Sequence, residues 1–254
     1  MKFLKPIVVA MCLVACLAMQ TSQSLYNYQC RHCGTLITAD HTPSSSGCPS
    51  SSYHSWTKLG TFGNTIYQCR HCGTIIYNET SPSSSGCPSS SYHSWSKLGT
   101  FGSNAYQCRH CGSTIYCSST PSSPGCTAAS YHSWTKLGGA SDKNYMCRHC
   151  GTIVHSSSTP SSSGCTASSY HSWTNLGNVG DQVYMCRHCG AVLYSESSPS
   201  TSGCPSSSYH SWTRIAHAGN NAYQCRHCGA TVYASSTPST TGCPSGSYHS
   251  WTKL

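Results

Sequence analysis

The chain has 254 residues, of which 21 are Cys, while charged residues make up 7% and hydrophobic residues 37%. An ordinary soluble domain is about 25% charged and 45–50% apolar, so this chain lacks the material for one large conventional core. The low charge also argues against a polyampholyte disordered chain, which leaves small units stapled by metal ions or cross-links.

The first segment has the features of an export signal. Lys2 and Lys5 precede an apolar run over residues 6–19, which is too short to span a bilayer and lies where a secretory signal lies. We therefore predict a signal peptide over residues 1–24 and a protein that is secreted or held at the cell surface. No second apolar stretch follows, so no transmembrane span is expected in the mature chain.

A possible lipid anchor overlaps this segment. Leu13-Val14-Ala15-Cys16 resembles a bacterial lipobox, and the resemblance implies cleavage before Cys16 and a lipid on its sulfur. The alternative is an ordinary signal cleaved within residues 20–24, which would discard Cys16.

The rest of the chain is one sequence written six times with a period of 39 residues and no insertion or deletion. Each copy holds Cys-Arg-His-Cys, Gly-Cys and Tyr-His-Ser-Trp at fixed spacing, which is the signature of a repeat array. The predicted repeats span residues 25–60, 61–99, 100–138, 139–177, 178–216 and 217–254.

Within the second repeat, short strands are predicted at residues 67–69, 74–77 and 94–98, where β-branched and aromatic residues gather. The Ser-Pro-rich segment 81–86 is a loop, and residues 99–104 are expected to turn into the next repeat. No segment has helical periodicity. The predicted fold is therefore a set of small all-β modules, and an unbroken period with short links predicts an elongated array.

Each repeat offers the pattern Cys-x2-Cys-x14-Cys-x5-His. Two thiolates on one tight turn, with a thiolate and an imidazole from a second turn, have the number and type of ligands of a closed structural zinc site. The pattern predicts about six zinc ions per chain. The predicted ligands are Cys30, Cys33, Cys48, His54, Cys69, Cys72, Cys87, His93, Cys108, Cys111, Cys126, His132, Cys147, Cys150, Cys165, His171, Cys186, Cys189, Cys204, His210, Cys225, Cys228, Cys243 and His249.

The segment Cys30-Arg31-His32-Cys33-Gly34 and its five copies resemble the first knuckle of the zinc-ribbon family, Cys-x-x-Cys-Gly. The resemblance covers nearly all of residues 26–254 and implies a zinc-stapled β fold, but it implies no particular function. The second knuckle departs from the family, because Gly47-Cys48-Pro49 is followed by His54 rather than by a Cys two residues on.

Other uses of the cysteines fit the repeated pattern less well. Disulfides suit an exported chain, but three Cys per repeat leave an unpaired thiol and give the fixed His no purpose. Haem attachment needs a His directly after Cys-x-x-Cys, where this chain has Gly, and a thioredoxin-like motif needs a βαβ context. Iron is the remaining rival, since similar knuckles bind it in rubredoxins, although those use four Cys.

Two assignments of the second knuckle stay open. The spacing from Cys33 to Cys48 and from His54 to Cys69 is the same, 14 residues. Cys48 and His54 can close a site with Cys30 and Cys33 behind them, which gives six sites. They can also pair with the Cys-x-x-Cys ahead across a hairpin over residues 56–68, which gives five sites.

Several residues lie outside the ligand pattern. The His between the two knuckle cysteines is expected to be an exposed turn residue, and the Arg beside it to offset the negative charge of the metal site. The repeated Trp, and the Tyr two residues before each Cys-Arg-His-Cys, are expected to form a small core, with an exposed sugar- or nucleobase-stacking platform as the alternative. Cys117 has no counterpart in the other repeats. It is expected to be an exposed non-ligand that can form an intermolecular disulfide.

Charge and chemistry limit the function. Loss of Lys2 and Lys5 lowers the formal charge from +9 to +7, and six Cys3His zinc sites at −1 each bring it near +1, so nucleic acid is not an expected partner. The five acidic residues are not periodic, and no catalytic constellation recurs. We predict a non-enzymatic, exported structural or binding protein, such as an adhesive or fibre-forming one, with an unidentified extracellular or self-association partner. The alternative is an iron-binding electron-transfer or metal-buffering protein.

Overall fold

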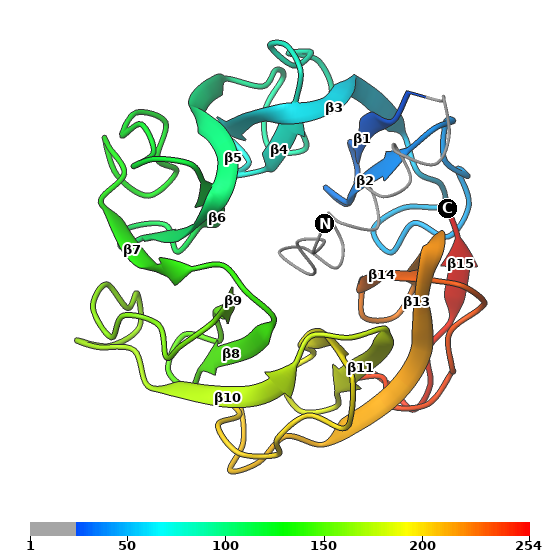
Figure 1. Cartoon of the computed structure of the whole chain (residues 1–254). Coiled ribbons are helices and arrows are strands. Elements are labelled where there is room, and N and C mark those ends of the chain that lie inside the picture. The colour runs from blue at the N-terminus through cyan, green and yellow to red at the C-terminus, as the bar shows by residue number, and fades with distance from the viewer. Residues whose placement is uncertain (1–23) are drawn as a thin grey trace, which may run out of the picture. The chain divides into compact units, whose positions relative to one another are not determined.

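The computed structural model describes residues 24–254, in two compact units, 24–137 and 138–254 (Figure 1). The predicted signal peptide and the lipobox with Cys16 lie outside the described residues, apart from Ser24. The described chain is all β, in repeated small units, as the sequence predicts. None of its segments between residues 24 and 254 is a helix long and apolar enough to cross a membrane.

Fifteen strands make up the two units. In the first unit they are β1 (Tyr26–Cys30), β2 (Leu36–Ala39), β3 (Trp56–Cys69), β4 (Ile75–Asn78), β5 (Trp95–Cys108), β6 (Thr114–Cys117) and β7 (Trp134–Gly139), the last of which runs to the unit boundary. In the second unit they are β8 (Lys143–Cys147), β9 (Ile153–Ser156), β10 (Trp173–Asn178), β11 (Gln182–Cys186), β12 (Val192–Ser195), β13 (Trp212–Cys225), β14 (Thr231–Ala234) and β15 (Trp251–Lys253).

Each repeat contributes one antiparallel sheet in which the first strand is central. In the first repeat β1 pairs with β2 on one side, with Tyr28 opposite Ile37, and with β3 on the other, with Cys30 opposite Trp56. The first two strands flank the Cys-x-x-Cys knuckle, and the third begins just after the second knuckle. The sheet therefore brings both knuckles to the same end of the repeat.

The predicted turn between repeats is wrong at three junctions. Residues 99–104 do not turn back but continue as part of β5, a single strand of 14 residues. Its first half pairs with β3 and completes the second repeat, while its second half pairs with β6 and opens the third. The hairpin expected over residues 56–68 is likewise the uninterrupted strand β3.

Glycines without room for a side chain accompany these long strands. A Cβ at Gly102 would lie 2.3 Å from the Cα of Ser118, and a Cβ at Gly63 would lie 2.6 Å from the backbone nitrogen of Glu79. Each long strand therefore passes close to the backbone that leaves the strand paired with its second half, β4 for Gly63 and β6 for Gly102, where a side chain would not fit. Gly-containing segments in a sequence suggest turns, but here the glycines allow close backbone contact.

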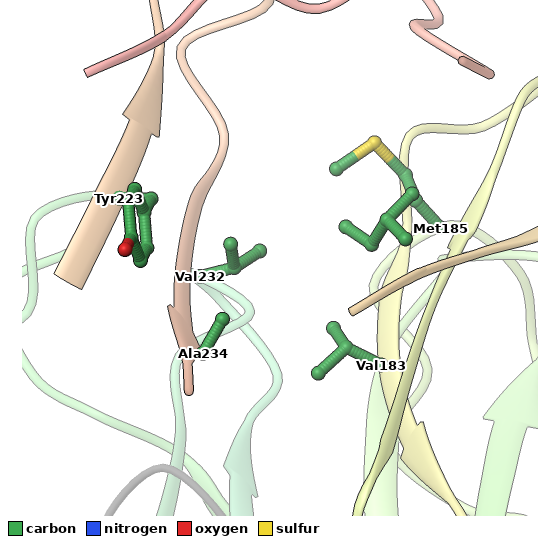
Figure 2. Close-up of a cluster of buried hydrophobic side chains, with 6 residues drawn as sticks. Val183, Met185, Tyr223, Val232 and Ala234 are labelled. Carbon is green, nitrogen blue, oxygen red and sulfur yellow. The ribbon is translucent and has the colours of Figure 1, made fainter. Parts of the chain in front are cut away.

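Apolar clusters lie between neighbouring repeats rather than inside each one. Ile66 and Leu98 from the second repeat pack with Ile115 from the third. In the second unit, Val183 and Met185 face Tyr223, Val232 and Ala234 of the next repeat (Figure 2). A single repeat therefore has only part of a core.

Buried glutamines also join repeats. The Gln29 side chain donates from Nε2 to the Gly34 carbonyl of its own knuckle, at 3.1 Å, and to Thr74 Oγ1 of the next repeat, at 2.6 Å. Gln68 makes the same link to Ser113 Oγ, at 2.9 Å. Both glutamines are fully buried, so these bonds satisfy groups that water does not reach.

The same two positions change together along the chain. Where the first position is Met instead of Gln, the second is Ala: Met146 packs in a cluster with Ala191, and Met185 in one with Ala230. The thioether of Met cannot donate a hydrogen bond to a hydroxyl. Ala at the second position has no hydroxyl, so no group there lacks a partner. The paired change is what a direct contact between the two positions requires.

The expected exposure of Cys117 is wrong. Its side chain is fully buried at the end of β6, in the cluster with Leu98 and Ile115, and it is not part of any ligand group. Because strand residues alternate between faces, Cys117 shares the inward face with Ile115. Asn78 and Ser156 are buried at the same position of their repeats, so the position is a small buried site and not a surface loop.

We expect Gln68→Met and Ser113→Ala to destabilise the protein singly by about 0.5–1.5 kcal/mol, since each removes one partner of the part-buried hydrogen bond between the two side chains. The double variant should recover most of that loss, because it recreates the Met–Ala pair found between later repeats. Chemical denaturation of all four proteins measures the coupling. The reciprocal pair, Met146→Gln with Ala191→Ser, is the matched control, and additive losses in both cycles would contradict the assigned contact.

Cys117 should not react with iodoacetamide in the folded protein, because its sulfur is inaccessible. Mass spectrometry of the native and the denatured protein measures this. Cys117→Ser should change the free energy of unfolding by less than about 1 kcal/mol, since Ser156 fills the equivalent position, whereas Cys117→Leu should overpack the site. Rapid native labelling at Cys117 would refute its burial.

Candidate metal centres

The backbone of each repeat builds two turns that face each other. In the first knuckle the Gly34 amide donates to the Cys30 carbonyl at 2.9 Å, and Gly34 takes a φ of 73°, which favours glycine. The Arg31 amide donates to the Ser55 carbonyl at 2.9 Å and ties the first knuckle to the second. These bonds recur at the equivalent positions of all six repeats.

The two turns bring three sulfurs and one imidazole together. In each group of Cys, Cys, Cys and His the candidate ligand atoms all lie within 4.8 Å of one another. Six such groups occur, and each takes its four members from one repeat, as in Cys30, Cys33, Cys48 and His54. The structure thus has the within-repeat arrangement. Cys69 and Cys72 form a group with Cys87 and His93, and not with the knuckle before them.

The geometry of the donors suits a tetrahedral ion. The sulfur of the second Cys in each Cys-x-x-Cys lies 3.6 or 3.7 Å from the Nδ1 of the ligand His in all six repeats, for instance 3.6 Å between Cys33 and His54. Zn–S and Zn–N bonds of about 2.3 and 2.0 Å at a tetrahedral angle put sulfur and nitrogen about 3.5 Å apart. Three thiolates and an imidazole, all supplied by the chain, would leave no ligand position for substrate.

The neutral state of the ligand histidines also favours metal binding. The histidines of the groups are almost completely buried, and burial, followed by the nearby His32, lowers the pKa of His54. A neutral imidazole keeps the lone pair that a metal needs. The hydrogen bond between Cys69 and Cys72 lowers the pKa of Cys72 to about 7 and raises the pKa of Cys69, so one thiolate of this pair is accessible at neutral pH.

A tryptophan orients each of these histidines. Trp95 stacks on the His93 ring with centroids 4.6 Å apart and planes at 21°, and its indole donates to the Ser83 carbonyl at 2.8 Å. The same stack recurs in the other five repeats. The buried Nε2 of His93 has no hydrogen-bond partner among the described residues. Stacking therefore takes the place of the second-shell hydrogen bond that usually fixes a ligand imidazole.

The His in the middle of each Cys-Arg-His-Cys belongs to none of the six groups, as the sequence predicts. It lies edge-on to the Tyr of Tyr-His-Ser-Trp, as His32 does to Tyr53 at 5.3 Å. Sequence reasoning missed this Tyr as a residue of interest. Its identity in all six repeats was the available signal, but the pattern did not show that the ring is exposed.

No family model matches the chain, and no curated protein and no solved structure is significantly similar to it.

Trp95→Ala should loosen the second metal site, because it removes both the stacked ring and the bond to the Ser83 carbonyl, at a cost of about 2–3 kcal/mol. Trp95→Phe keeps a ring over His93 and should lose only about 1 kcal/mol. Release of metal to a colour-forming chelator is the measurement. One sixth of the metal should leave early in the alanine variant, and a single slow phase in both variants would contradict the orienting role.

Proposed function

We propose that this chain is an exported, non-enzymatic structural or binding protein whose six repeats are each stapled by one zinc ion in a zinc-ribbon-like module. The observation that carries the proposal is the sixfold Cys3His group, with donor spacing that suits tetrahedral zinc. The N-terminal Lys2 and Lys5 with the apolar run over residues 6–19 support export, to the medium or to the cell surface.

The closed ligand set supports a structural metal. A catalytic zinc keeps one position for water or substrate, whereas four protein donors converge here in every repeat. The core also needs the ion, because the apolar clusters are small and shared between repeats. Structural zinc contributes about 10–16 kcal/mol of apparent binding free energy to small domains, which exceeds the whole stability of many.

Metal analysis tests the proposal directly. The protein purified without added metal should contain six zinc ions per chain and should unfold on treatment with a strong chelator. Cys108→Ser should bind five. Because β5 ends the second repeat and begins the third, that loss should also destabilise the second repeat, which hydrogen exchange resolves.

Four results would decide against the proposal. Six disulfide-bonded pairs or an absence of metal would remove the staple. A red, redox-active protein with bound iron would favour the electron-transfer alternative. Zinc that leaves within seconds from a protein that stays folded would favour metal buffering.

A further inference from the structure

Every repeat carries the same three side chains beside its metal site, and all are exposed except for the half-buried His149. We call the three the knuckle patch: the Arg and His of Cys-Arg-His-Cys and the Tyr of Tyr-His-Ser-Trp. The six patches consist of Arg31, His32 and Tyr53; Arg70, His71 and Tyr92; Arg109, His110 and Tyr131; Arg148, His149 and Tyr170; Arg187, His188 and Tyr209; and Arg226, His227 and Tyr248.

The tyrosines of the patches are the large exposed apolar side chains of the described chain. Their exposed fractions are 54–55% in all six repeats, whereas Tyr28 and Tyr106, from the other tyrosine position, are only 5% exposed. A ring that is half in water adds little to a core. Folding therefore does not explain why this position is Tyr six times, while the exposed Ser, Thr and Pro loops around it vary.

The rings are also held in a fixed orientation. Each patch His meets its Tyr edge-on, with centroids 4.9–5.4 Å apart. In the last three repeats the His Nδ1 also bonds the Tyr backbone carbonyl at 2.9–3.0 Å, as His149 does with Tyr170. The metal knuckle thus fixes an aromatic platform in advance, which lowers the entropy lost on binding.

Hydrogen-bond donors surround the platform. The six patch arginines are exposed, and none forms an ion pair or a side-chain hydrogen bond within residues 24–254. In the second unit a hollow of about 420 Å³ opens beside His149, between Gly151 on one repeat and Pro205 and Ser206 on the next. His149 belongs both to the platform, where it contacts Tyr170, and to the wall of this hollow.

Resting on the proposed role as an exported binding protein, we propose that the six knuckle patches bind a polysaccharide. The C–H face of a sugar ring packs on the Tyr ring, and the Arg and His donate to sugar hydroxyls or to a uronate carboxylate. Six equal weak sites on one chain match a polymer of equal units, and linkage converts weak contacts into firm retention.

Charge favours this ligand over a nucleic acid. Each patch Arg lies in the same knuckle as a Cys3His zinc site of net charge −1, so the local potential is close to neutral. Nucleic-acid affinity depends on an excess of positive charge against phosphates, which this surface lacks. A sugar polymer needs a flat aromatic face and donors, which the patch supplies.

The test compares three zinc-loaded full-length proteins on insoluble cellulose, chitin and polygalacturonate, with immobilised poly(dT) as the other ligand class. The first is the natural chain, the second has Tyr→Ala at all six patch positions, and the third has Tyr→Phe at the same six. We expect the natural chain to be retained on at least one polysaccharide. Tyr→Ala should weaken retention about tenfold or more, while Tyr→Phe keeps most of it, because the ring face makes the contact.

A fourth variant changes only Tyr170, Tyr209 and Tyr248. It should lose more than half of the additional binding free energy that comes from linking six sites on one chain, as a multivalent contact requires. As a measurement that needs no variant, the retaining polysaccharide should protect the patch tyrosines of the natural chain from tetranitromethane, which mass spectrometry reads by position.

Lack of retention on all three polysaccharides, equal retention of the Tyr→Ala protein, or binding to poly(dT) alone would overturn the inference. Zinc content separates this from failure of the proposed function. A chain that contains six zinc ions but does not bind polysaccharides refutes only the proposed ligand of the patches. A chain without zinc refutes the proposed structural metal sites.

Discussion

The structure depends on the convergence of three sulfurs and one imidazole at the end of each small sheet. A repeat of 39 residues with few large apolar side chains cannot bury enough surface to order itself. The Cys3His group can hold a metal ion with only four residues, and the two turns of the repeat present these ligands. Nearly all other features of the repeat either bring the two turns together or orient their side chains.

Neighbouring repeats within a unit share strands and apolar clusters, so they are not structurally independent. Strands such as β5 end one repeat and begin the next without a break, and the apolar clusters lie across the same junctions. The buried Gln29 also joins two repeats, because its side-chain amide donates hydrogen bonds to the metal knuckle of its own repeat and to a hydroxyl of the following one. Stability should therefore spread between neighbours, as in other repeat proteins whose interfaces carry part of each unit's energy.

Three aromatic positions in each repeat have different structural roles. The Tyr on the first strand is buried in five repeats and half-buried at Tyr67, and Tyr106 packs between repeats. The Trp lies over the ligand His and takes the place of a hydrogen bond to it. The Tyr before the ligand His faces outward. The expected aromatic core thus holds for the first position and in part for the Trp, which packs half-buried against the apolar clusters, as Trp134 does, and also stacks on the ligand His.

Local pattern alone determined the repeat period, the ligand types and the all-β character, because ligand chemistry and β propensity act over a few residues. It left the grouping of knuckles undecided, since a 14-residue spacing runs both ways from Cys48 and His54. The pairing of Cys30 with Trp56 across β1 and β3 decides it, by returning the second knuckle to the first. The uninterrupted run of β5, the burial of Cys117 and the exposure of Tyr53 also follow from tertiary contacts. Each depends on which backbone or side chain lies opposite in space, and sequence spacing does not encode that neighbour.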